Sequence, residues 1–69
     1  MKKAQIEKIK KEIEKLTVNL EMATARRNRT LEIMKEDASW EMFLEEDTKR
    51  VEYYTKHINR LNAMIKGAA

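Results

Sequence analysis

The sequence predicts an all-α fold, an antiparallel two-helix hairpin that is coiled-coil-like. Its 69 residues are 39% charged and 42% hydrophobic, with one Gly, no Pro and no Cys, a composition typical of long helices. Two stretches carry apolar residues at alternating spacings of three and four, the pattern of one helix face. A short polar segment, 35–39, separates them. The length leaves room for one domain, residues 1–69.

The first helix is expected over about residues 3–36. Its stripe is continuous and contains one charge, at Arg27. The stripe residues are Ile6, Ile9, Ile13, Leu16, Leu20, Thr24, Arg27, Leu31 and Met34. At 100° per residue these positions stay within roughly ±40° of one line along the helix. They therefore predict a single face that packs against a partner.

The second helix is expected over about residues 39–66, after a turn at about 37–38. Asp37 and Ser39 are both suitable N-caps, because their side-chain oxygens can accept from the free N–H groups of the next turn. Gly67 follows the last stripe residue and is expected to end the helix in a left-handed conformation. The stripe residues are Trp40, Leu44, Asp47, Val51, Tyr54, Ile58, Leu61 and Ile65.

The two stripes match only if the chain reverses near residue 37. Facing residues of an antiparallel hairpin have nearly constant index sums, and a reversal there gives a sum of about 74, as for Met34 and Trp40. A break at 28–30 instead needs a sum of about 58, which sets Ile13 against Glu45. That alternative is rejected because it places apolar residues opposite charges.

Arg27 and Asp47 interrupt the two stripes where Leu or Ile is expected. Their indices also add to 74, so the sequence predicts that they face each other as a structural ion pair. A paired polar layer in a helical interface costs stability but fixes register. The alternative function for Arg27 is to bind a phosphate or carboxylate.

Apolar residues outside the stripes predict self-association, because a chain this short gains little stability from one core. The possible dimer flank consists of Met42, Phe43, Tyr53, His57 and Met64. We expect a homodimer that forms a four-helix bundle. Residues 21–52 sum to −3 and the remainder to +6, which favours turns at opposite ends. In shape alone this dimer resembles the small plasmid-encoded helical-hairpin dimers that regulate RNA pairing.

A second off-stripe cluster lies on the back of the first helix and combines arginine with apolar residues, as protein-binding hot spots do. Its members are Val18, Met22, Ala25, Arg26, Arg29 and Ile33. We expect these residues to bind a protein partner. The expected function is a small non-enzymatic interaction module, an adaptor, subunit or inhibitor that occludes or bridges its partner. Such composition is common among small regulators encoded by phages and plasmids.

Nucleic-acid binding is the alternative, with phosphate contacts from Arg26, Arg29 and the lysines of the first helix. The lysines are Lys8, Lys10, Lys11 and Lys15. Glutamates alternate with them, and pairs such as Glu7 with Lys11 favour a solvated helix face. A purely structural coiled-coil fragment is the third possibility.

The sequence offers little for catalysis, so we expect no enzymatic activity and no cofactor or metal. There is no Cys, the single His is His57, and the single Gly excludes a glycine-rich phosphate loop. His57 lies one turn after Tyr53 and is expected to pack on it, the alternative being a titratable switch. Acidic pairs such as Glu41 and Glu45 lack the Glu-x-x-His sequence of bundle metal sites.

No apolar run approaches the roughly 20 residues that span a bilayer. Membrane insertion is therefore not expected. A peripheral role for the Lys-rich first helix is a minor alternative, because its apolar face is already needed in the hairpin. No apolar signal core follows the first residues, and the protein is expected to be cytoplasmic.

Overall fold

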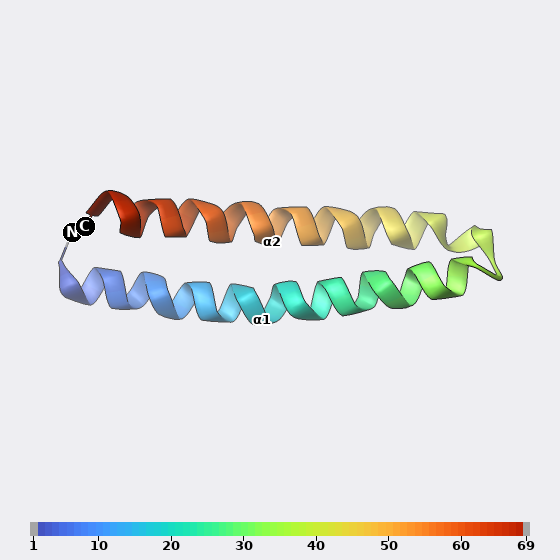
Figure 1. Cartoon of the computed structure of the whole chain (residues 1–69), viewed down its shortest axis with the longest axis horizontal. Helices are drawn as coiled ribbons and strands as arrows, with labels where there is room; N and C mark the ends of the chain where they lie inside the picture. Colours follow the sequence, from blue (N-terminus) through green and yellow to red (C-terminus); the bar gives the residue numbers. More distant parts are fainter. Residues whose placement is uncertain (1, 69) are drawn as a thin grey trace.

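The structure is a computed structural model that describes residues 2–68, and it is a hairpin of two long helices (Figure 1). Helix α1 spans Lys3–Met34, a 3₁₀ turn η1 spans Ala38–Trp40, and helix α2 spans Glu41–Ala68. The helices lie side by side and antiparallel, in a rod of 52 × 15 × 12 Å. The predicted fold class, an all-α helical hairpin, is confirmed.

The predicted domain, 1–69, includes Met1 and Ala69, which lie outside the described residues. Helix α1 ends at Met34, two residues before the predicted limit. Its last turn tightens, because the Lys35 and Glu36 N–H groups donate three residues back, to the Glu32 and Ile33 carbonyls at 3.3 and 3.1 Å.

Asp37 lies at the reversal of the chain and is the N-cap of η1. Its carboxylate accepts from the Ser39 backbone N–H at 3.0 Å and from the Ser39 hydroxyl at 2.6 Å. These bonds favour the ionised carboxylate, and the Ser39 hydroxyl is the largest cause that lowers the pKa of Asp37 from its usual 3.8. Glu41 then lies in the first turn of α2, where negative charge suits the helix dipole. The turn therefore lies at the predicted place.

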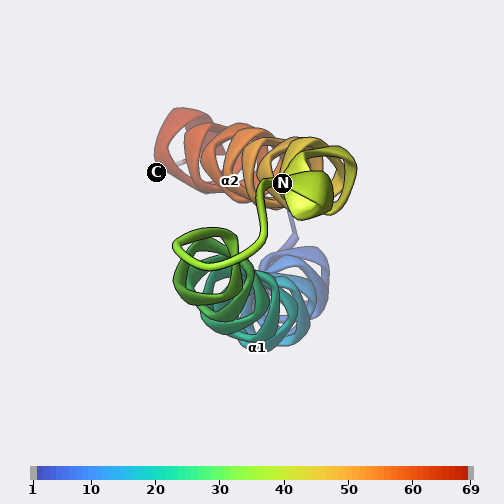
Figure 2. The same ribbon diagram turned by 90° about the vertical axis from the view of Figure 1, so that its right-hand side faces the viewer.

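The interface between the helices follows a seven-residue repeat, with positions labelled a to g and with a and d facing the other helix. Every a and d residue is buried or half-buried. On α1 these are Ile6, Ile9, Ile13, Leu16, Leu20, Ala23, Arg27, Thr30 and Met34. On α2 they are Trp40, Leu44, Asp47, Val51, Tyr54, Ile58, Leu61 and Ile65, as predicted. The view along the rod shows the helices inclined to each other (Figure 2), as in a supercoil.

The prediction that Thr24 and Leu31 belong to the interface stripe of α1 is wrong. Thr24 is exposed and Leu31 is 39% exposed, whereas Ala23 and Thr30 are only 7% and 4% exposed. A strict repeat of 3.5 residues places 23 and 30 at position d and moves 24 and 31 to position e, at the edge of the interface.

The predicted left-handed end at Gly67 is also wrong. Helix α2 continues through Gly67 to Ala68, and no residue in the described chain has a positive φ. Gly67 is exposed, so water can satisfy the last carbonyls of the helix without a cap.

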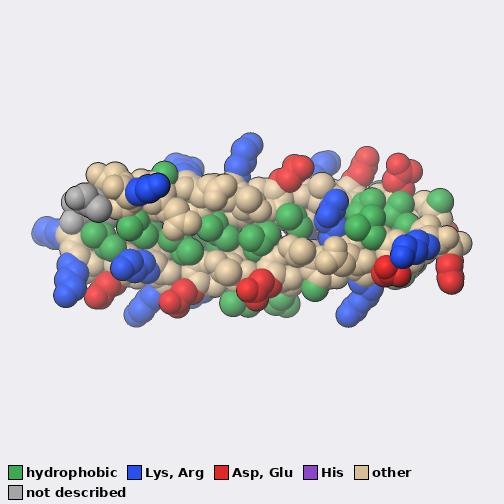
Figure 3. Space-filling model, in the orientation of Figure 1, with side chains coloured by type: hydrophobic (Ala, Val, Ile, Leu, Met, Phe, Trp, Pro, Cys, Tyr) green, Lys and Arg blue, Asp and Glu red, His purple; other side chains and the backbone are tan. Residues whose placement is uncertain are grey.

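The hydrophobic core is thin. Hydrophobic side chains form a row along the junction of the helices, interrupted by a basic side chain in the half nearer the turn, and most charges project outward (Figure 3). No large side chain of the described residues is fully buried. The large hydrophobic residues that remain exposed are Val18, Met22, Leu31, Met42, Phe43, Tyr53 and Met64. The hairpin therefore buries one layer and leaves substantial apolar surface in contact with water.

Candidate functional site

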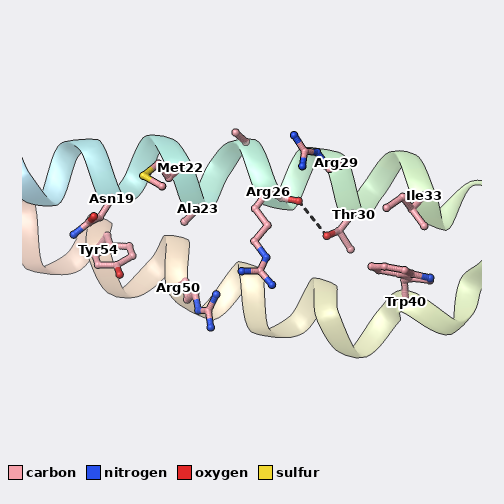
Figure 4. Close-up of a pocket in the computed structure, with 11 residues that line it drawn as sticks. Asn19, Met22, Ala23, Arg26, Arg29, Thr30, Ile33, Trp40, Arg50 and Tyr54 are labelled. Carbon is pink, nitrogen blue, oxygen red and sulfur yellow. Dashed lines mark hydrogen bonds between the residues drawn. The ribbon is translucent and has the colours of Figure 1, made fainter.

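A groove of about 700 Å³ runs along one side of the junction between α1 and α2. Figure 4 shows it from the side opposite to that of Figure 1, with α1 above α2. Helix α1 contributes Asn19, Met22, Ala23, Ala25, Arg26, Arg29, Thr30 and Ile33, and Trp40, Arg50 and Tyr54 come from the second half of the hairpin. We call this surface the groove. Both helices contribute to its lining.

The groove brings together most of the cluster that the sequence placed on the back of the first helix. Met22, Ala25, Arg26, Arg29 and Ile33 all line it. Val18 does not line it and is 54% exposed elsewhere on α1. The cluster lies nearer α2 than predicted because Arg26 and Ile33 occupy position g, which flanks the interface, and Met22 and Arg29 occupy the adjacent position c. Their binding role stays a prediction.

The residues that α2 adds were not assigned to this surface from the sequence. Arg50 occupies position g, and in an antiparallel helix pair the g positions of both helices lie on the same side. Phe43, His57 and Met64 share position g with Arg50. Three residues of the possible dimer flank therefore lie on the groove side of α2, whereas Met42 occupies position f and Tyr53 lines a separate hollow on α2.

The charge of the groove is carried by three arginines. Its lining contains Arg26, Arg29 and Arg50 and no acidic residue. Arg26 extends from α1 across the groove toward α2 (Figure 4), and its Nε lies 3.5 Å from Oδ1 of Asp47. Within the described chain, Arg29 and Arg50 have neither an ion pair nor a side-chain hydrogen bond. These two guanidinium groups are available to a ligand.

The predicted ion pair between Arg27 and Asp47 is wrong. Asp47 instead accepts from the Thr30 hydroxyl at 2.9 Å and lies beside Arg26, whereas the Nε of Arg27 donates to the Thr48 hydroxyl at 3.1 Å. The cause is the repeat: Thr30 and Asp47 both occupy position d, and Arg27 at position a reaches toward position e of α2. The charges still form one polar layer near the turn, with different partners.

This polar layer is satisfied within the chain. The carboxylate of Asp47 is 4% exposed, whereas the side chain of Arg26 is 62% exposed. The Thr30 hydroxyl also lies 3.0 Å from the Arg26 carbonyl, one turn earlier in α1. No buried side-chain nitrogen or oxygen of residues 2–68 lacks a hydrogen-bond partner. The layer is thus a structural feature beneath the groove, and Arg26 and Thr30 belong to both.

Aromatic rings cover the face at both ends of the groove. Trp40 and Phe43 have ring centroids 5.0 Å apart at the turn end. Further along α2, the rings of Tyr53 and His57 are 6.0 Å apart and nearly parallel, at 13°. This stacking supports the predicted packing of His57 on Tyr53.

The described residues form neither a metal-binding cluster nor a membrane-spanning helix. In the part of the chain that the structure describes, no three His, Cys, Asp or Glu residues are grouped to hold a metal ion. Over the same residues, neither helix combines the length and apolarity needed to cross a bilayer.

The fold and the groove together define the class of molecule, a helical hairpin with an arginine-rich, apolar face. Comparison with protein families, curated proteins and solved structures finds no match for this chain.

Proposed function

We propose that the protein is a non-enzymatic interaction module that binds a partner protein through the groove. The observation that carries the proposal is the composition of the lining, which combines three arginines with Met22, Ile33 and two aromatic residues. Arginine, tryptophan, tyrosine and methionine are the residues enriched in the centres of protein interfaces.

The dimensions of the hairpin suit this role. A side of the rod measures 52 Å by 15 Å, which is comparable with the roughly 800 Å² that each partner buries in a standard interface. Met22 is 67% exposed on this face, so covering it would remove apolar surface from water. A module of this kind acts as an adaptor, subunit or inhibitor, by occluding or bridging its target.

The expected homodimer stays a proposal. Two hairpins that associate through Phe43, His57 and Met64 would cover the groove as well, because these residues share its face. Self-association and partner binding are then competing states of one surface. Sedimentation at micromolar concentration tests the dimer directly.

Nucleic-acid binding remains the second candidate, and one observation favours it. Three arginines lie together with Trp40 and Tyr54, a combination that can contact phosphates and stack on bases. A gel shift at low and at physiological salt tests it, because binding driven by phosphates weakens steeply as salt rises. Binding centred on Met22 and Ile33 tolerates salt.

The test of the proposed function is site-specific photo-crosslinking in cells. A photoreactive residue in place of Met22 in the groove is expected to give discrete protein adducts. The same residue in place of Thr24, which is exposed at the opposite edge of α1, is expected to give none. Equal adducts at both positions, or adducts to nucleic acid alone, would contradict the proposal.

A matched pair of charge reversals sharpens this test. Arg29→Glu plus Arg50→Glu is expected to abolish the adducts from position 22. Lys10→Glu plus Lys49→Glu makes the same change of charge at exposed residues outside the groove and is expected to leave them unchanged.

A further inference from the structure

We infer that the groove binds an amphipathic helix that carries carboxylates in its central turn. This inference rests on the proposed function and specifies the chemistry of the partner. It follows from the order in which apolar and basic side chains are arranged along the groove.

The apolar side chains lie at the two ends of the groove. Ile33 and Trp40 lie at the turn end, and Met22 with Tyr54 lies at the other end (Figure 4). Met22 and Ile33 are eleven residues apart on α1, which is about 16 Å at 1.5 Å per residue. A helix of three turns covers that length, and a groove between two helices is a common receptor for the apolar face of a third.

The arginines lie between these apolar ends. Arg26 reaches across the groove toward α2, Arg29 lies on α1 and is directed away from α2, and Arg50 lies on α2 (Figure 4). The carboxylate of Asp47 forms an ion pair with Arg26 and with neither Arg29 nor Arg50. Guanidinium groups bind carboxylates in a bidentate geometry. The occupant therefore needs acidic side chains in its centre and apolar side chains toward both ends.

A nucleic acid fits this arrangement less well. Glu12 shares position g with Arg26, and Glu46 occupies position c of α2, the position that flanks g. Both are exposed on the same face, Glu12 beyond the terminal end of the groove and Glu46 on the outer side of α2, level with Arg29. A polyanion that followed the whole face would meet both glutamates, because its charge is continuous. A short helix with carboxylates only in its central turn fills the groove without reaching Glu12.

A second copy of the chain also fits less well. The groove arginines lie within residues 21–52. In a dimer with turns at opposite ends they would face the terminal half of the other copy, which sums to +6. In a dimer with turns at the same end, arginines would face arginines. In both arrangements the groove arginines themselves would face positive charge, which costs binding energy, although residues 21–52 as a whole sum to −3.

Trp40 supplies the measurement, because it is the only tryptophan of the chain and lines the groove. The probe is a synthetic helical peptide of about four turns without Trp or Tyr. It has Leu at positions i, i+4, i+7 and i+11 and Glu beside them in the central turn. We expect the Glu peptide to shift the emission of Trp40, and the matched Gln peptide to bind at least about tenfold more weakly.

Charge reversal in the protein provides the control. The variant with Arg29→Glu and Arg50→Glu is expected not to bind the Glu peptide and to bind a matched Lys peptide instead. These two residues are chosen because neither pairs with Asp47, so the polar layer beneath the groove stays intact. Lys10→Glu plus Lys49→Glu should bind the Glu peptide as the natural protein does. Circular dichroism establishes that both variants are folded.

Equal binding of the Glu and Gln peptides would overturn the inference, as would binding of a single-stranded oligonucleotide without the Glu peptide. A dimer in sedimentation that the Glu peptide does not dissociate would identify a second copy as the occupant and also overturn it. If crosslinking from position 22 persists while the Glu peptide fails, the inference is wrong and the proposed function stands. If both fail, the proposed function is wrong.

Discussion

Replacement of Asp47 by Ala should destabilise the hairpin by about 2 kcal/mol. The carboxylate is 4% exposed and accepts a hydrogen bond of 2.9 Å from Thr30, itself 4% exposed. A hydrogen bond to a charged group contributes roughly 1.5–3 kcal/mol. The neighbouring Arg26 is 62% exposed at 3.5 Å, so solvent limits that ion pair to at most about 1 kcal/mol. Most of the loss should therefore come from Thr30.

A double-mutant cycle followed by thermal unfolding tests this partition. For a chain of this length, 2 kcal/mol lowers the Tm by roughly 10 °C. The coupling between Thr30→Val and Asp47→Ala should exceed about 1 kcal/mol, whereas Arg27→Ala and Asp47→Ala should be additive. Thr30→Val combined with Asp47→Leu should recover the stability, because it replaces a buried polar pair by apolar side chains. A larger coupling for Arg27 than for Thr30 would refute the reasoning.

Three further outcomes are expected. Asp37→Asn should reduce the loss of Tm on acidification. Because the pKa of Asp37 is lowered in the folded protein, the ionised cap stabilises the hairpin above the usual pKa of 3.8, and this stabilisation is lost as the pH falls through the folded pKa. Identical profiles of Tm against pH for the two proteins would contradict this prediction. Leu16→Ala, at a residue 7% exposed, should cost about 2–4 kcal/mol in urea denaturation, whereas Val18→Ala should change stability by less than about 0.5 kcal/mol. Gly67→Ala should raise the helical content measured by circular dichroism, since Gly67 is helical and a Cβ there meets nothing within 4 Å. The expected gain in the free energy of unfolding is about 0.5 kcal/mol.

The hairpin itself could be predicted because its signals are local. The alternating spacing along each helix and the capping oxygen of Asp37 both act within a few residues. Index sums then align the two helices to within about a residue, which is why the turn was found. The same sums could not identify the partner of Asp47, because Arg27 and Thr30 are both close enough in number. Only the position within the repeat, a or d, separates them.

The groove was only half predictable. Its α1 residues form a cluster that a helical wheel shows directly, from Met22 to Ile33. The contribution of Trp40, Arg50 and Tyr54 depends on which side of α1 faces them, and that is a property of the packed pair. Thr24 and Leu31 were misplaced for a related reason, since a straight helix and a supercoiled one diverge after several turns.

Both helices bring their outer ends to the same pole of the rod (Figure 1). A fluorophore, affinity handle or bead attached through either end therefore holds the hairpin by that pole and leaves the indole of Trp40, at the far pole, unobstructed. Opposing tension applied through both ends would separate the two helices progressively, from this pole toward the turn. The terminal isoleucines and leucines would yield first, and the Thr30–Asp47 bond near the bend would be among the last contacts to break.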